Sequence, residues 1–159
     1  DRELTAAAVE RDLECTIRYF MEHPGYGADF FNRKLRSMWT EPTFQSLWIQ
    51  EVKGFGWLFS AFARSLFKEG GMANEVYWEL CNAVQTMVYA GALLFAVFRF
   101  RRVQFQGLLF AVIFIGGFLF HLFWEAKGQY AVSYFVLLIP YAVLGIQDWL
   151  HWVSKRRFV

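Results

Sequence analysis

The residues of this sequence that are best suited to chemistry lie together in the run 121–130. The run reads HLFWEAKGQY and carries an imidazole, a carboxylate, an ammonium, an amide and a phenol. Lys127 could hold a phosphate group by charge-assisted hydrogen bonding, and Gln129 and Tyr130 could add donors beside it. We therefore predict a site that binds an anionic substrate.

Two plainer interpretations of the same run stay open. Glu125 and Lys127 could form an interfacial cap, in which they pair with each other or with lipid headgroups. His121 and Glu125 share a face if the helix extends as far as Glu125. A metal site built on these two residues is the weaker alternative, because two ligands do not complete a tetrahedral set. We predict substrate-binding roles for both residues and no metal ligands.

The composition of the chain indicates a membrane protein. Of its 159 residues, 57% are hydrophobic and 21% are aromatic, more than a soluble domain of this size buries. The abundance of aromatic residues excludes intrinsic disorder. The net charge of +2 is too small to indicate nucleic-acid binding. Cys15 and Cys81 are too few for a disulfide framework or a cysteine metal site.

Three apolar stretches must position the candidate site. Leu80–Phe98, Phe105–Trp124 and Ala131–Trp149 each approach the ~20 residues that cross ~30 Å of hydrocarbon. We predict three transmembrane helices over these ranges. Gly116-Gly117 is interpreted as a place of close packing, and Pro140 as the cause of a kink.

Basic clusters predict the orientation of these spans. Arg99–Arg102 lies between the first and second spans, and Lys155–Arg157 follows the third. Lys and Arg mark the cytoplasmic face, so both clusters face the cytoplasm. Residues 1–75 and the link 125–129 are then extracytoplasmic, and the protein is a multi-pass protein of the plasma membrane with its C-terminus in the cytoplasm.

The segment 1–75 is predicted to be helical and to lie on the membrane. Apolar residues recur at helical spacing over Glu3–Glu22, and a second helix is expected over about Ala28–Trp39. Thr43 is the candidate N-cap of a short helix that ends at Gln50. The apolar run Trp57–Phe67 is too short to cross and predicts an interfacial helix. The predicted fold is all-α, with this outward-facing amphipathic segment followed by the three spans in residues 76–159.

Two runs of the sequence resemble a known family. FNRKLRSMWTEPTFQSLWI, residues 31–49, and HLFWEAKGQYAVSYFVLLIP, residues 121–140, are similar to the C-terminal third of bacterial GT-C membrane glycosyltransferases, near the dolichyl-phosphate-mannose protein mannosyltransferases. Such proteins often carry an acidic residue, a basic residue, a tyrosine and then prolines at the outer end of a late span, a pattern that Glu125, Lys127, Tyr130 and Pro140 fit. Gln129 stands where an arginine is frequent, so Lys127 would take over that phosphate contact.

The resemblance implies transfer of a sugar from a polyprenyl-phosphate donor to an extracytoplasmic acceptor. It also implies a longer polytopic protein whose catalytic Asp or Glu lies in the first outward loop, upstream of Asp1. The chain begins without an initiator Met, and we expect it to be the C-terminal part and inactive alone. No cofactor is evident, and a divalent metal in the full-length protein is left open. Expected partners are the polyprenyl-phosphate-linked sugar, membrane lipids and the rest of the chain.

Other classes of protein remain as alternatives. One is a non-catalytic membrane module, such as part of a polysaccharide flippase or channel, or an assembly subunit. The other is a soluble helical bundle whose helices only resemble spans. The sequence does not indicate which sugar or acceptor is used.

Overall fold

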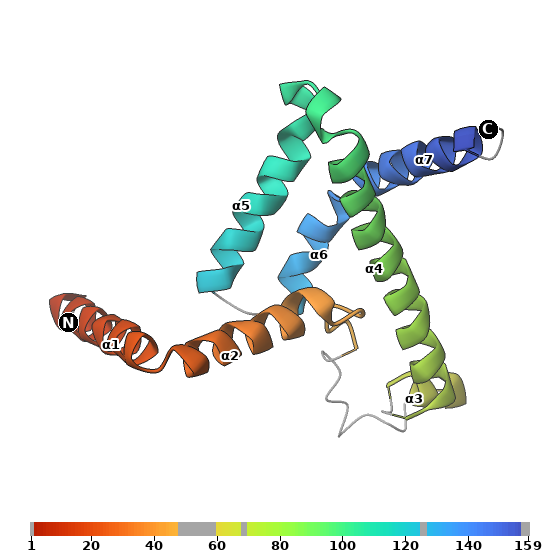
Figure 1. The fold of residues 1–159 in the computed structure, drawn as a ribbon. Coiled ribbons are helices and arrows are strands. Elements are labelled where there is room, and N and C mark those ends of the chain that lie inside the picture. Colours follow the sequence, from red (N-terminus) through yellow and green to blue (C-terminus); the bar gives the residue numbers. More distant parts are fainter. Residues whose placement is uncertain (1, 48–59, 68–69, 125–126, 157–159) are drawn as a thin grey trace. The chain divides into compact units, whose positions relative to one another are not determined.

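The computed structural model is all-helical, as predicted (Figure 1). It describes residues 2–47, 60–67, 70–124 and 127–156, and these contain no β-strand. The chain divides into two compact units, Asp1–Arg36 and Ser37–Val159. The predicted division between residues 75 and 76 concerned the side of the membrane rather than compactness, and it stays a prediction.

The first unit consists of two helices, α1 (Arg2–Glu22) and α2 (Pro24–Leu35). The predicted helix Glu3–Glu22 is confirmed. The second helix starts four residues before the predicted Ala28, because proline is favoured at the first helical position, where its missing N–H has no partner to lose. Phe20 of α1 packs on Phe30 of α2, with ring centroids 5.4 Å apart.

A π-helical turn, Arg36–Thr40, follows α2, and a run of turns covers residues 42–47. A helix that starts at Thr43 was predicted here, and this prediction is wrong, because residues 42–47 form turns. The Glu41 side chain binds the backbone N–H of Thr43, and this local hydrogen bond favours a turn over a helix. Residues 48–50 of the predicted helix lie outside the described residues.

Hydrogen bonds join the end of α3 (Ala61–Phe67) to the start of α4 (Met72–Phe98). The N–H of Ala73 donates to Ser65 Oγ at 3.1 Å, and Asn74 Nδ2 donates to the carbonyl oxygen of Leu66 at 2.8 Å. Because these bonds satisfy groups that helix termini leave unpaired, α4 begins well before the predicted Leu80. The described part of the predicted interfacial helix, from Ala61, is helical; residues 57–59 lie outside the described range.

The most extensive contact between helices of the described residues joins α4 to α7 (Ile139–Arg156), which cross in Figure 1. A Cβ atom on Gly91 would lie 2.7 Å from the carbonyl oxygen of Ala142, and one on Gly145 would collide with the carbonyl oxygen of Gly91 and the backbone nitrogen of Phe95. The two backbones are therefore in contact at this crossing, which only glycine permits.

The second predicted span is shorter as an α-helix than expected. Two 3₁₀ turns, Phe100–Arg102 and Phe105–Leu108, precede α5 (Leu109–Phe123). The Tyr141 hydroxyl holds the start of α5 in place. It accepts a hydrogen bond from the N–H of Ala111 at 3.0 Å and donates one to the carbonyl oxygen of Gly107 at 2.7 Å.

The third predicted span, Ala131–Trp149, is not one continuous helix. It is divided between α6 (Gly128–Val136) and α7, which meet at an angle of 52°. Pro140 lacks the N–H that would bond to the carbonyl oxygen of Val136, and its ring crowds that carbonyl. The predicted kink is thus present. Close packing is confirmed at Gly117, where a Cβ would collide with Tyr134, but space around Gly116 is open.

Within the described residues, α4 is the one helix that is long and apolar enough to cross a membrane by itself. The bent pair of α6 and α7 passes the same test if it is counted as one span. The apolar helix α5 is shorter, with 15 residues.

Candidate functional site

The turn that follows Trp39 is organised by the Glu41 carboxylate. Oε1 accepts hydrogen bonds from the Thr43 hydroxyl at 2.7 Å and from the Thr43 N–H at 3.2 Å, and Oε2 accepts one from the Gln45 N–H at 2.6 Å. Phe44 and Gln45 have φ values of 49° and 59°, a left-handed conformation that residues other than glycine rarely adopt. Hydrogen bonds to a charged acceptor offset this strain.

Polar side chains of α4 hold the same turn. The Tyr89 hydroxyl donates to the carbonyl oxygen of Trp39 at 2.7 Å, and Gln85 Nε2 donates to that of Glu41 at 3.4 Å. Gln85 and Tyr89 are four residues apart and therefore lie on one face of α4. The indole nitrogen of Trp39 is buried and has no hydrogen-bond partner among the described residues. The indole N–H of Trp39 is therefore an unsatisfied hydrogen-bond donor at the place where the turn meets α4.

The same turn contacts the beginning of α6, which lies in the predicted site. The N–H of Gly128 donates to the side-chain oxygen of Gln45 at 3.1 Å, and Gln129 Nε2 donates to the Gln45 carbonyl oxygen at 3.4 Å. A Cβ on Gly128 would lie 3.3 Å from the carbonyl carbon of Phe44, so glycine allows the two backbones to approach. Phe44 also packs on Phe135 of α6, with centroids 5.0 Å apart.

Two of the predicted site residues lie against each other. His121 is buried on α5, with 6% of its surface exposed. Its ring is nearly parallel to that of Tyr130 of α6, with an interplanar angle of 10° and centroids 6.0 Å apart. Tyr134, one turn further along α6, meets the imidazole edge-on at 5.5 Å. The imidazole therefore lies between two helices and is enclosed by phenol rings.

The remaining predicted residues have separate outcomes. Lys127 is exposed and extended immediately before α6, and Gln129 is exposed on its first turn. Glu125 lies outside the described residues. The condition for His121 and Glu125 to share a helix face is not met, because α5 ends at Phe123 and Trp124 has ψ of −135°.

The turn, the middle of α4 and the start of α6 meet at one place, which we call the junction. The sequence did not single out the turn residues that complete this junction. Glu41 and Gln45 were part of the run that resembles the glycosyltransferases, but no role was assigned to them. The proline after Glu41 and the polar residues around it are the signal of a turn. Their contact with α6, however, joins positions more than 80 residues apart in the chain, as the Gln45–Gly128 bond shows.

The chemistry available at this junction is hydrogen bonding and positive charge. An ammonium, an amide and a phenol, each exposed, follow one another at Lys127, Gln129 and Tyr130, beside the buried imidazole. Such donors suit phosphate or carboxylate oxygens. The described residues include no group of three or more His, Cys, Asp or Glu that could hold a metal ion. No protein-family model, curated protein or solved structure matches the chain.

Proposed function

We propose that the chain is part of an integral-membrane glycosyltransferase of the GT-C superfamily, and that it contributes to the site for a polyprenyl-phosphate sugar donor. One observation carries the proposal. The two runs that resemble this superfamily are far apart in sequence, yet Gln45 of the first is hydrogen-bonded to Gly128 and Gln129 of the second. A shared site explains why both patterns occur in one chain.

Three crossings of a membrane are part of this proposal. At 1.5 Å per residue, the 27 residues of α4 extend about 40 Å, more than the ~30 Å of hydrocarbon. The 3₁₀ turn before α5 and α5 itself together approach that thickness. Apolar side chains are exposed along α5, among them Phe110, Val112, Ile115 and Phe120. A large exposed apolar surface supports contact with lipid.

Charge supports the orientation predicted from the sequence. Arg99 and Arg102 follow α4, and Lys155 lies in the last turn of α7. In the proposed orientation these residues face the cytoplasm. Residues 1–75 and the link 125–129 then face outward. In a topology test, an impermeant amine reagent should label Lys127 from outside intact cells and Lys155 only after lysis; labelling of Lys127 solely from the cytoplasm would contradict the donor site.

Each residue of the site has a proposed role. Lys127 holds the donor phosphate, Gln129 and Tyr130 add hydrogen bonds, and His121 shapes the pocket with Tyr130. Glu125 orients Lys127. In the transfer, the acceptor oxygen forms a bond to the anomeric carbon while the bond from that carbon to the phosphate oxygen breaks. A carboxylate from the first outward loop of the full-length protein takes the acceptor proton, and Lys127 stabilises the departing phosphate.

The proposal is tested by donor binding to the purified chain. The chain is reconstituted in phosphatidylcholine nanodiscs, and a polyprenyl phosphate is titrated while bound lipid is counted by native mass spectrometry. Lys127→Ala should weaken binding about tenfold or more, because a hydrogen bond to a charged group contributes ~1.5–3 kcal/mol. Lys127→Arg should bind nearly as well as the wild type.

A control variant removes an exposed positive charge from the 3₁₀ turn after α4. Arg101→Gln removes one positive charge, as Lys127→Ala does, and it should change polyprenyl-phosphate binding less than about twofold. Equal losses in the two variants would refute a donor site at Lys127 and indicate attraction by charge alone. No binding by the wild type would instead favour a non-catalytic membrane module.

A further inference from the structure

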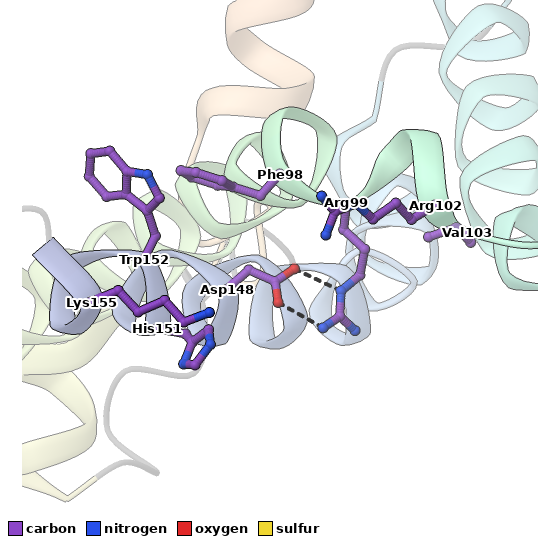
Figure 2. Close-up of a pocket in the computed structure, with 8 residues that line it drawn as sticks. All are labelled: Phe98, Arg99, Arg102, Val103, Asp148, His151, Trp152 and Lys155. Atoms are coloured by element: carbon purple, nitrogen blue, oxygen red, sulfur yellow. Dashed lines mark hydrogen bonds and ion pairs between the residues drawn. The ribbon is translucent and has the colours of Figure 1, made fainter.

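A polar cavity lies at the opposite end of α4 from its contact with α3. The cavity has a volume of about 570 Å³ and lies between the chain that follows α4 and the last turns of α7 (Figure 2). Arg99 and Asp148 face each other across it, with Arg99 Nε and one terminal nitrogen each 2.7 Å from a carboxylate oxygen. This two-bonded pair connects the two elements and neutralises Asp148.

The other polar residues of the cavity leave it positively charged. Arg102, His151 and Lys155 line it, and no carboxylate among the described residues pairs with Arg102 or Lys155. Asp148 is the one acid in the lining and is occupied by Arg99. Two exposed cations therefore face one cavity that contains no free counter-charge of its own.

An apolar edge adjoins these cations. Phe98 and Trp152 also line the cavity, and their rings lie 5.9 Å apart. The guanidinium of Arg156 lies 4.1 Å above the Trp152 ring, which holds the indole in place through a cation–π contact. The cavity thus offers both cations and aromatic surface, a combination suited to a charged headgroup attached to a hydrocarbon chain.

We infer that this cavity binds a phosphate group, held by Arg102 and Lys155 while the Arg99–Asp148 pair maintains the cavity's shape. A planar guanidinium and an ammonium are the usual donors to phosphate oxygens. Basic pockets between helices at the cytoplasmic side bind the phosphates of anionic lipids. The phosphate chemistry does not depend on the donor site proposed above; a lipid source for it rests on the proposed membrane insertion.

The test compares two adjacent arginines. Arg102 lines the cavity, whereas Arg101 does not, and both side chains are exposed. The purified chain is titrated with a short-chain phosphatidylglycerol, and retained lipid is measured by native mass spectrometry, with phosphatidylcholine of the same chain length as the uncharged reference. We expect Arg102→Gln and Lys155→Gln each to weaken phosphatidylglycerol binding about fivefold. Arg101→Gln should weaken it less than twofold, and Lys155→Arg should retain binding.

Further measurements separate the source of the phosphate and exclude misfolding. Helical circular dichroism and the melting temperature of each variant should equal those of the wild type, because the substituted side chains are exposed. Phosphatidylglycerol binding that requires Arg102 supports a lipid source, and binding of inorganic phosphate at similar concentration that requires Arg102 supports a soluble one. Equal effects of the Arg101 and Arg102 substitutions, or no phosphate binding from either source, would overturn the inference. Loss in Lys127→Gln but not in Lys155→Gln would overturn it too and leave the donor site standing.

Discussion

The crossing of α4 and α7 gives the sharpest prediction about stability. In Gly145→Ala, the new Cβ would meet the Gly91 carbonyl oxygen and the Phe95 backbone nitrogen. These are backbone atoms of another helix, so they cannot rotate away as a side chain would. The helices would have to separate at the point where they are closest.

The expected cost follows from two opposing effects. Overpacking costs about 1–3 kcal/mol of folding free energy. Because the atoms that the new Cβ meets belong to the backbone and cannot rotate away, the cost for Gly145→Ala is expected at the upper end, about 3 kcal/mol. Alanine is favoured over glycine in a helix interior by about 1 kcal/mol. The net loss for Gly145→Ala is therefore about 2 kcal/mol. Gly116→Ala is the matched control, since a Cβ there meets no atom within 4 Å, and it should gain about 1 kcal/mol.

Thermal unfolding in detergent, followed by circular dichroism, measures both substitutions. At roughly 2–4 °C per kcal/mol, Gly145→Ala should lower the melting temperature by about 4–8 °C, and Gly116→Ala should raise it by about 2–4 °C. The two substitutions are chemically identical and both lie inside helices, so effects on the unfolded chain are matched. A Gly145→Ala variant as stable as Gly116→Ala would refute the proposed close crossing.

Two further predictions concern single hydrogen-bonding groups. Glu41→Gln places a donor beside the N–H of Gln45, so about 2 kcal/mol of local stability should be lost and hydrogen exchange at the Gln45 amide should accelerate roughly 30-fold; unchanged exchange would show that the carboxylate does not hold the turn. Tyr141→Phe leaves the carbonyl oxygen of Gly107 and the N–H of Ala111 without their shared partner and should cost about 1–2 kcal/mol, with a melting temperature about 2–8 °C lower. A melting temperature equal to that of the wild type would mean that other groups satisfy the start of α5.

Much of the helical content follows from local patterns. The apolar residues of Glu3–Glu22 recur at helical spacing, and α1 occupies almost the same range. Pro140 predicted a kink, and the chain bends between α6 and α7. Element ends were less predictable. Thr43 has the residue type of a helix cap, but its N–H donates to the Glu41 carboxylate in a turn. The helix α4 begins two turns before the predicted Leu80, where the N–H of Ala73 donates to the Ser65 hydroxyl of α3.

The residues of the candidate site were chosen from the sequence by their types, and their binding role stays a prediction, whereas their contacts come from the structure. The run from His121 to Tyr130 was identified from its residue types, and the stacking of these two rings follows from the path of the chain between α5 and α6. The end of α5 at Phe123 removed the expected common face with Glu125. The sequence identified the basic residues after α4 as markers of topology, but not their place beside Asp148.

The sequence alone determined that the chain is helical, where prolines interrupt it, and which side chains carry positive charge or hydrogen-bond donors. Those properties depend on spacing over a few residues, because backbone hydrogen bonds and helix faces repeat within a turn. The tertiary structure decided that Gln45 meets Gly128 and that Arg99 meets Asp148. Such pairs are far apart in the chain, and only the packing of whole helices, at crossings such as Gly91 with Gly145, brings them together.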